Sequence, residues 1–400
     1  MKKLCIALVG LPAMGKSTLA QKLKANITEE GFQAEVFNNG QVRRESIEQD
    51  TSKVSFYQSE KGKQVLENIA HYNIRRAQDF LAKGDVVILD ATNATEKRRQ
   101  LIENSFKCPT LFIKCHYSDE EILSASIWQK TKMSEFGHMS ELDAFSSFEQ
   151  RINFYQQIYE PLQTERNHLT FDTVENHILD VNLADSIPHY VLVRDVLVTD
   201  WIKNLYLVRH GKTYYNLEDR IGGNSTLNDT GWQQAQFLGY HFRNTRIPRI
   251  FVSEKERTHQ MARALLNYQD SKLIVIPEFN EIDAGICENM TYDEIKSRYP
   301  EIFRKRMRDK YNYIYPEGEG YITLYDRAIK GLKKALFLSE NADHMMIVGH
   351  QAVNRIILSY FLYRKTEDVP FTYVPQNKYF HITSGLQNKS IKMQKFTDLT

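Results

Sequence analysis

The chain has 400 residues, more than one ordinary hydrophobic core accommodates, so two domains are expected. Hydrophobic residues make up 42% and charged residues 26%, an ordinary globular balance, and no stretch approaches the roughly 20 apolar residues of a membrane span. The net charge of +2 argues against a general nucleic-acid-binding surface.

Four cysteines are scattered without the spacing of a disulfide framework or a zinc site: Cys5, Cys108, Cys115 and Cys287. Reduced thiols in a cytoplasmic protein are therefore expected. The start Met1-Lys2-Lys3 and the apolar run after it imitate a secretory signal, but that run leads directly into a Gly-rich loop and a helix pattern. A first β-strand over Leu4–Val9 explains the run better.

A phosphate-binding loop follows this predicted strand. The pattern G-x-x-x-x-G-K-[ST] is complete and opens into a helix-like stretch, which is the setting that the motif requires. Backbone N–H groups of such a loop surround phosphate oxygens at a helix N-terminus. Lys16 is expected to reach the β- and γ-phosphates of ATP, and Ser17 to hold Mg²⁺. The expected ATP-binding residues are Gly10, Leu11, Pro12, Ala13, Met14, Gly15, Lys16, Ser17 and Thr18.

Two further strands are predicted over Ala34–Phe37 and Val86–Leu89. Arg43 and Arg44 follow the first, where two arginines can grip a phosphorylated substrate, although a solvated helix start is the alternative. Asp90 ends the second. An acid there, after a phosphate-binding loop, suits Mg²⁺ coordination or acceptance of a hydroxyl proton, and a helix N-cap is its alternative role.

The remainder of the first half continues to alternate. Strands are predicted over Leu111–Lys114 and Leu169–Phe171, and helices over 62–83, 119–133 and 140–159. This order implies an α/β domain with a doubly wound parallel sheet. Together with the phosphate-binding loop, the acid and the basic residues, it indicates a small-molecule kinase.

Residues 182–203 join two different halves, and no internal repeat relates them. We expect a boundary between residues 195 and 196, so that the domains span 1–195 and 196–400. The apolar stretch Val191–Val198 is interpreted as a strand that packs on either domain.

The second half is organised around Leu205–Asn216, in which a run of strand-forming residues leads into Arg209-His210-Gly211. Open α/β sheets bind their ligands at such strand ends. An imidazole there can accept a phosphoryl group while a guanidinium binds its oxygens. The tripeptide is short, so by itself it is compatible with an inert histidine.

Other chemically competent side chains are expected at the same rim. Arg257 and His350 each follow a predicted strand, and Glu281 lies in a loop where a carboxylic acid can protonate a leaving oxygen. A turn at Gly222-Gly223 can approach a phosphate through its backbone N–H groups. Because several side chains from separate parts of the sequence are expected at one edge of the sheet, we infer a phosphoryl-transfer site there, with His210 as nucleophile.

The first half resembles the kinase domain of the 6-phosphofructo-2-kinase/fructose-2,6-bisphosphatase family. The matching residues are the phosphate-binding loop, Asn38 with Gly40-Gln41 and Arg43-Arg44-Glu45, Asp90-Ala91-Thr92-Asn93, Arg98-Arg99, and Arg151-Ile152 with Tyr155. The resemblance implies ATP and Mg²⁺ on this half, with Ser17 and Asp90 as metal-side residues and Asp90 and Lys16 as catalytic ones. It implies fructose 6-phosphate contacts from Arg43, Thr92, Arg98, Arg151 and Tyr155.

Three positions depart from that family pattern. Gly62 stands in place of an arginine, and the position of a family cysteine aligns with Tyr117, two residues from Cys115. The position of a family lysine aligns with Thr131, between Lys130 and Lys132, and the sequence does not choose between these two neighbours.

The second half resembles the histidine phosphatase (phosphoglycerate mutase-like) superfamily and, within it, fructose-2,6-bisphosphatase, through residues 280–285, 290–292, 309–311 and 350–355. Lys212 replaces a family glutamate. The basic and aromatic run 304–315 would suit RNA as an alternative to a sugar phosphate. The resemblance implies bisphosphate contacts from Arg209, Asn216, Gly222, Arg257, Tyr292, Arg306, Lys310, Tyr321, Gln351 and Arg355.

Taken together, the two resemblances imply a bifunctional enzyme. One half would make fructose 2,6-bisphosphate from fructose 6-phosphate and ATP, and the other would hydrolyse it through a phosphohistidine, without a cofactor. His210, Glu281, His350, Arg209 and Arg257 are the expected catalytic residues of the phosphatase. Neither a nucleic acid nor a membrane is an expected partner, and a homodimer is implied by resemblance only.

Two other functions compete with this prediction. The kinase half can be a weak or regulatory nucleotide-binding module attached to a working phosphatase, or the chain can heal RNA ends as a kinase-phosphatase. The near-neutral charge and the intact sugar-phosphate residues argue against the second.

Overall fold

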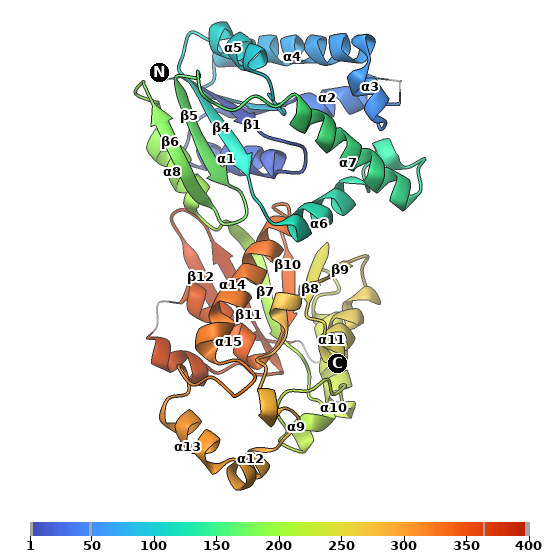
Figure 1. Cartoon of the computed structure of the whole chain (residues 1–400), viewed down its shortest axis with the longest axis vertical. Helices are drawn as coiled ribbons and strands as arrows, with labels where there is room; N and C mark the ends of the chain where they lie inside the picture. Colours follow the sequence, from blue (N-terminus) through green and yellow to red (C-terminus); the bar gives the residue numbers. More distant parts are fainter. Residues whose placement is uncertain (1–2, 48–49, 363–364, 397–400) are drawn as a thin grey trace. The chain divides into compact units, whose positions relative to one another are not determined.

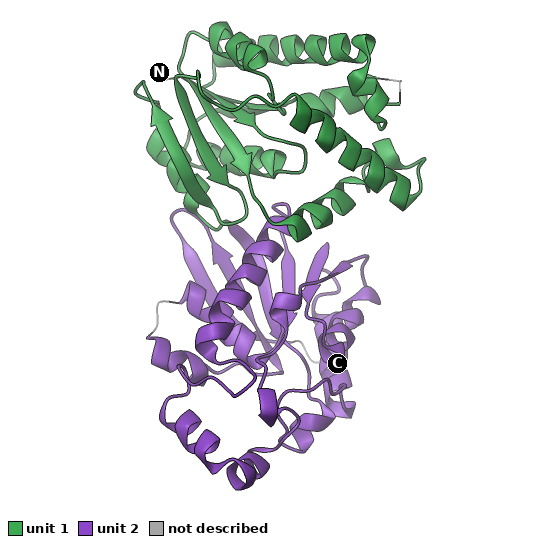
Figure 2. Ribbon diagram, viewed as in Figure 1, with its two compact units in different colours: residues 1–201 green, residues 202–400 purple. Residues whose placement is uncertain are grey.

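The computed structural model describes residues 3–47, 50–362 and 365–396, so the signal-like start is described only from Lys3. The chain divides into two compact units, residues 1–201 and 202–400 (Figure 2). The boundary expected between residues 195 and 196 falls inside helix α8 (Tyr190–Val198) of the first unit. None of the helices in the described part of the chain combines the length and the apolar character needed to cross a bilayer.

Unit 1 contains a six-stranded sheet in the order β2-β3-β1-β4-β5-β6. The first five strands in this order run parallel, and β6 is antiparallel to β5. The predicted doubly wound α/β fold is confirmed. The sheet is mixed, however, because the edge strand β6 is antiparallel, and this sixth strand was not predicted. The strands are β1 (Leu4–Val9), β2 (Ala34–Asn38), β3 (Val86–Asp90), β4 (Thr110–His116), β5 (Asn167–Asp172) and β6 (His177–Leu183).

Helices cover both faces of this sheet (Figure 1). On one face, α4 and α5 bury Ile74 and Ile102 against alternate residues of β1 and β3, such as Ala7 and Val87. On the other, α1 packs on β2 and β3 and also contacts α8. The helices are α1 (Lys16–Glu29), α2 (Asn39–Ser46), α3 (Val54–Gln58), α4 (Glu60–Leu81), α5 (Glu96–Ser105), α6 (Glu120–Lys130), the 3₁₀ turn η1 (Ser134–Phe136), α7 (Glu141–Gln157) and α8 (Tyr190–Val198).

The strand predicted over Val191–Val198 is wrong, because this segment is the helix α8. Val193, Val196 and Leu197 are buried, whereas Val191 and Val198 are exposed. That spacing of three and four residues is helical, and only one face of the segment packs against the unit. In so short an apolar run the two periods cannot be separated by composition.

Unit 2 also contains a six-stranded sheet, in the order β12-β11-β7-β10-β8-β9. Strands β7, β10, β8 and β9 are parallel, while β11 is antiparallel to β7 and to β12. The strands are β7 (Ile202–Arg209), β8 (Arg249–Val252), β9 (Lys272–Val275), β10 (Met345–Gly349), β11 (Lys378–Ser384) and β12 (Lys389–Lys395).

Two pairs of helices enclose the sheet of unit 2. Leu238 of α10 and Met261 of α11 pack with Val208 and Val348 on one face, while α14 and α15 pack together and α15 contacts β7. The helices are α9 (Tyr214–Leu217), α10 (Asp229–His241), α11 (Glu256–Leu266), α12 (Tyr292–Arg298), α13 (Pro300–Arg308), α14 (Tyr321–Leu338) and α15 (Gln351–Phe361), with 3₁₀ turns η2 (Pro277–Phe279), η3 (Gly285–Cys287) and η4 (Thr366–Phe371).

Candidate active sites

Unit 2 contains a cavity of about 310 Å³ beyond the carboxyl ends of β7, β8 and β10. Parallel strands bring these ends to one rim, which is where α/β sheets bind ligands. Almost every residue predicted for the second half lines this cavity: Arg209, His210, Asn216, Gly222, Arg257, Glu281, Tyr292, Arg306, Lys310, Tyr321, Gln351 and Arg355.

The ring of His210 is oriented by a hydrogen bond at Nδ1, which leaves Nε2 for a ligand. Nδ1 lies 2.8 Å from the carbonyl oxygen of Gly211, which can only accept, so Nδ1 carries the proton and Nε2 keeps its lone pair. Burial lowers the pKa of His210 well below its ordinary value, and the charges of Arg257 and Arg209 lower it further. A buried neutral imidazole with a free lone pair is a competent nucleophile.

His350 lies behind the cavity wall, fully buried, with its ring centroid 5.2 Å from that of His210. Arg257 donates from Nε to His350 Nδ1 at 3.2 Å. Since Nδ1 accepts, the neutral ring carries its proton on Nε2, which donates to Ser253 Oγ at 2.8 Å. Ser253 was not singled out from the sequence, and a serine that closes a strand carries no signal by itself.

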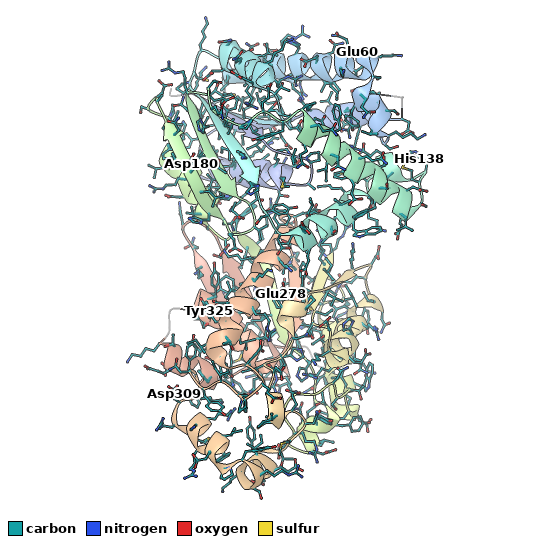
Figure 3. The ribbon with its side chains drawn as sticks, viewed as in Figure 1. Glu60, His138, Asp180, Glu278, Asp309 and Tyr325 are labelled. Carbon is teal, nitrogen blue, oxygen red and sulfur yellow. The ribbon has the colours of Figure 1, made fainter. Side chains whose placement is uncertain are left out.

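Glu281 reaches the same cavity from the loop after η2. Its carboxylate accepts from the backbone N–H groups of Gln351 at 2.9 Å and Ala352 at 3.1 Å, at the first turn of α15. A helix N-terminus stabilises an anionic side chain. Arg327 fixes this loop, because it donates to the carbonyl oxygen of Asn280 at 2.9 Å and to the carbonyl oxygen of Glu278. Glu278 is labelled in Figure 3.

Cationic and phenolic side chains form the far wall of the cavity. Arg306 donates to the Tyr292 hydroxyl at 3.2 Å, and Arg355 donates to the Tyr321 hydroxyl at 2.9 Å. Lys310 donates to the carbonyl oxygen of Pro370 at 3.2 Å. Burial, with the charges of Arg306 and Arg355, lowers the pKa of Lys310 to about 8. A small separate core that includes Cys287, Ile295 and Tyr315 supports this wall.

One N–H group of the Gly222-Gly223 turn is already paired within the protein. Gly222 lines the cavity, but the N–H of Gly223 donates to Glu288 Oε2 at 2.6 Å and is therefore already paired with a protein carboxylate. Both glycines have positive φ, and a Cβ on Gly222 would lie 2.2 Å from the Glu288 carboxylate. The turn also accepts from Arg257 through the Gly223 carbonyl at 2.8 Å, so it positions the arginine.

Asn216 is fixed from two directions. Its Oδ1 accepts from the backbone N–H of Thr213 at 3.1 Å, in the capping box of α9, and from Gln376 Nε2 at 2.9 Å. Gln376 precedes β11, some 160 residues away along the chain, and no local pattern marks it as part of this site.

Unit 1 contains a second cavity of about 270 Å³ beside the phosphate-binding loop. The loop has the required backbone, with Gly10, Ala13 and Gly15 at positive φ, and α1 begins directly after Gly15. A Cβ on Gly10 would lie 2.6 Å from the carbonyl oxygen of Cys115. Of the predicted ATP-binding stretch, Pro12, Ala13, Lys16 and Ser17 line the cavity, whereas Gly10, Leu11, Met14, Gly15 and Thr18 do not.

Lys16 and Asp90 face each other across this loop. Lys16 donates to the carbonyl oxygen of Leu11 at 2.6 Å; burial lowers its pKa and the Asp90 charge opposes that shift. Burial raises the pKa of Asp90, while Ser17 and the charges of Lys16 and Lys130 lower it. Asn38 donates to the Asp90 carboxylate and caps α2 through Gln41 N at 2.8 Å, a link that the sequence did not predict.

The buried carboxylate of Asp90 and the hydroxyl of Ser17 meet at the cavity, and these are the oxygen ligands that Mg²⁺ prefers. No cluster of three or more His, Cys, Asp or Glu residues that could hold a metal by itself occurs in the described residues. Mg²⁺ commonly takes one or two protein ligands together with nucleotide phosphates, so the residues present fit that ion.

All five residues expected to contact fructose 6-phosphate line the unit 1 cavity: Arg43, Thr92, Arg98, Arg151 and Tyr155. The two candidate lysines differ in position. Lys130 lines the cavity, whereas Lys132 is about half exposed and pairs with Glu141 on the surface.

Two departures from the family pattern have local causes. A Cβ on Gly62 would lie 1.8 Å from the carbonyl oxygen of Phe56, because the end of α3 packs directly on α4 and excludes an arginine there. Tyr117 is buried and donates to the carbonyl oxygen of Ala13 at 3.2 Å, so it supports the phosphate-binding loop from below.

The class of protein follows from these two sites and from the family models that the chain matches. A model of 6-phosphofructo-2-kinase matches residues 1–197, and a model of the histidine phosphatase superfamily (branch 1) matches residues 205–386. The chain is therefore a P-loop kinase-type unit joined to a histidine phosphatase unit.

Curated relatives combine the same two parts. The chain is 34% identical over 397 residues to a 6-phosphofructo-2-kinase/fructose-2,6-bisphosphatase of Gallus gallus, covering 94% of this chain and 82% of the relative. It is 32% identical over 398 residues to the Homo sapiens protein 6-phosphofructo-2-kinase/fructose-2,6-bisphosphatase 3, covering 94% and 74%. The chain belongs to the 6-phosphofructo-2-kinase/fructose-2,6-bisphosphatase family, as the resemblance implied.

Two solved structures that are similar to this chain each cover about half of it. An alpha-ribazole phosphatase from Shigella flexneri shows 23% identity and a TM-score of 0.45, over 49% of this chain and 96% of that structure. A mycobacterial glucosyl-3-phosphoglycerate phosphatase in complex with VO3 shows 17% identity and a TM-score of 0.42, over 48% and 96%.

Proposed function

We propose that the two cavities are the two active sites of a bifunctional enzyme. Unit 1 makes fructose 2,6-bisphosphate from fructose 6-phosphate and ATP, and unit 2 hydrolyses it to fructose 6-phosphate and phosphate. The observation that carries the proposal is the pairing of His210 and His350, with ring centroids 5.2 Å apart and Arg257 donating to one of them. The family to which the chain belongs supports the choice of substrates.

In unit 2, the lone pair of His210 Nε2 attacks the phosphorus of the 2-phosphoryl group, and the bond to the 2-oxygen of the sugar breaks. Arg209 and Arg257 bind the equatorial oxygens. Behind them, His350 accepts from Arg257 Nε through Nδ1 and so holds this arginine in place, while its own proton on Nε2 is donated to Ser253.

Glu281 enters this step in its acid form, which the arriving phosphate dianion favours, and gives its proton to the leaving 2-oxygen. Its carboxyl group lines the cavity and is held by the first turn of α15, so it stays aimed at the same point in both steps. In the second step it takes a proton from water, which attacks phosphohistidine and releases phosphate. Lys310, Arg306, Arg355 and Tyr321 hold the 6-phosphate.

In unit 1, the phosphate-binding loop and Lys16 hold ATP, and Arg43 and Arg151 bind the phosphate of fructose 6-phosphate. When bound, Mg²⁺ would be held by Ser17 and Asp90 and would neutralise phosphate charge. Asp90 accepts the proton of the 2-hydroxyl as that oxygen attacks the γ-phosphorus, and the bond from this phosphorus to the bridging oxygen breaks to release ADP. Lys130 adds a positive charge on the same side of the cavity.

Two variants test the two halves separately. His210→Ala should abolish phosphate release from fructose 2,6-bisphosphate and phosphohistidine formation, while ADP formation from ATP and fructose 6-phosphate continues. Lys16→Met should show the opposite pattern. A working phosphatase with no ADP formation in the wild type would favour the regulatory kinase half. The homodimer implied by the resemblance and the cytoplasmic location inferred from the cysteines stay predictions, which sedimentation and cell fractionation test.

A further inference from the structure

A buried carboxylate lies between the two arginines of the unit 1 cavity. Glu135 Oε2 pairs with Arg43 NH2 at 2.6 Å, and Oε1 pairs with Arg151 NH1 at 3.4 Å. Glu135 belongs to η1, between α6 and α7, and its side chain is only 6% exposed. Neither the sequence nor the family resemblance singled it out.

The Glu135 carboxylate pairs with only one nitrogen of each guanidinium. Arg43 also donates from NH1 to the Tyr57 hydroxyl, but its Nε is buried and has no partner among the described residues. Nε and NH2 of Arg151 are buried and equally without a partner in the described part of the chain. These three nitrogens are shielded, but both arginines line the cavity, so a ligand there meets guanidiniums that protein partners have not saturated.

Arg151 is further confined by aromatic rings. Its guanidinium carbon lies 5.0 Å from the ring centroids of Tyr57 and Phe148 and 5.3 Å from that of Phe136. Rings favour a cation over their faces but do not fix its rotation or the distance to a second cation. A carboxylate that bridges both guanidiniums does fix these, and it offsets the repulsion between two buried positive charges.

We propose that Glu135 is a positioning residue for the kinase reaction: it holds Arg43 and Arg151 at the separation and orientation in which both guanidiniums bind the phosphate of fructose 6-phosphate. The inference rests on the proposed kinase function of unit 1. Glu135 itself touches the arginines and takes no proton in the reaction.

The opposite role makes an opposite prediction. If Glu135 were an internal competitor that occupies the phosphate site, removing its charge would tighten sugar-phosphate binding. If it positions the arginines, removing its charge weakens binding, because two repelling guanidiniums lose the group that bridges them. The sign of the change in KM therefore separates the two roles.

The test uses the full-length protein with Glu135→Gln and measures ADP formation. The KM for fructose 6-phosphate should rise about ten- to hundredfold, as expected for a lost hydrogen bond to charged groups, while kcat and the KM for ATP stay within about twofold. Inorganic phosphate should become a weaker competitive inhibitor against fructose 6-phosphate. Glu135→Asp, which keeps the charge but shortens the reach, should give an intermediate KM.

Glu141→Gln is the matched control, because this carboxylate is 70% exposed and pairs with Lys132 on the surface, so it should leave every constant unchanged. Unaltered hydrolysis by unit 2 and an unaltered KM for ATP show that the Glu135 variants are folded. A KM for fructose 6-phosphate that falls or does not change overturns the inference. Absence of ADP formation in the wild type would instead overturn the kinase function itself.

Discussion

Lys310 should give bisphosphate hydrolysis a pH dependence near 8. Its pKa is lowered to about 8 by burial and by the charges of Arg306 and Arg355. Only the protonated amine attracts the 6-phosphate, so binding is strong below pH 8 and is lost as the pH rises through that value. For one group with this pKa, the binding-competent fraction is about 0.9 at pH 7, about 0.5 at pH 8 and about 0.1 at pH 9.

The expected result is a decrease in kcat/KM of about tenfold between pH 7 and pH 9, because kcat/KM reports the ionisation of the free enzyme. The assay is phosphate release from fructose 2,6-bisphosphate at each pH in a buffer of constant ionic strength. Lys310→Arg is the control, since a guanidinium stays charged throughout this range and should flatten the profile. A flat wild-type profile, or an unchanged decrease in the arginine variant, would refute the reasoning.

Three further predictions concern single residues. Ser253→Ala removes the hydrogen-bond partner that keeps the His350 proton on Nε2, so kcat for hydrolysis should decrease about tenfold with little change in KM. An unchanged kcat would contradict this role of Ser253. Lys130→Ala should reduce ADP formation at least tenfold, whereas Lys132→Ala should stay within about twofold; equal losses would show that position in the cavity is not what matters. Gly10→Ala places a Cβ 2.6 Å from a backbone carbonyl oxygen of β4, so it should weaken ATP binding as measured by calorimetry. Phosphate release by unit 2 should persist. A normal ATP affinity would count against the close approach.

The elements of both units follow largely from local sequence. Apolar runs that end at a glycine-rich loop, as at Val9, or at a charged residue, as at Asp90 and Arg209, are strands whose ends carry the chemistry. Prediction failed where a short segment was apolar on one face only, at α8. It also failed at the edge strand β6, which is largely exposed and mixes polar with apolar residues without strict alternation. Local pattern is weak in both cases because tertiary packing chooses the conformation.

What the amino-acid sequence by itself determined is the set of groups that react: a phosphate-binding loop, an acid, arginines, and two strand-end histidines, each recognisable from a few adjacent residues. Only the tertiary structure decided how these groups are oriented. Ser253 fixes the proton on His350, Glu135 bridges Arg43 and Arg151, and Gln376 holds Asn216, each from a distant part of the chain. Such contacts depend on distances across the folded unit, and neither residue type nor spacing along the chain records those distances.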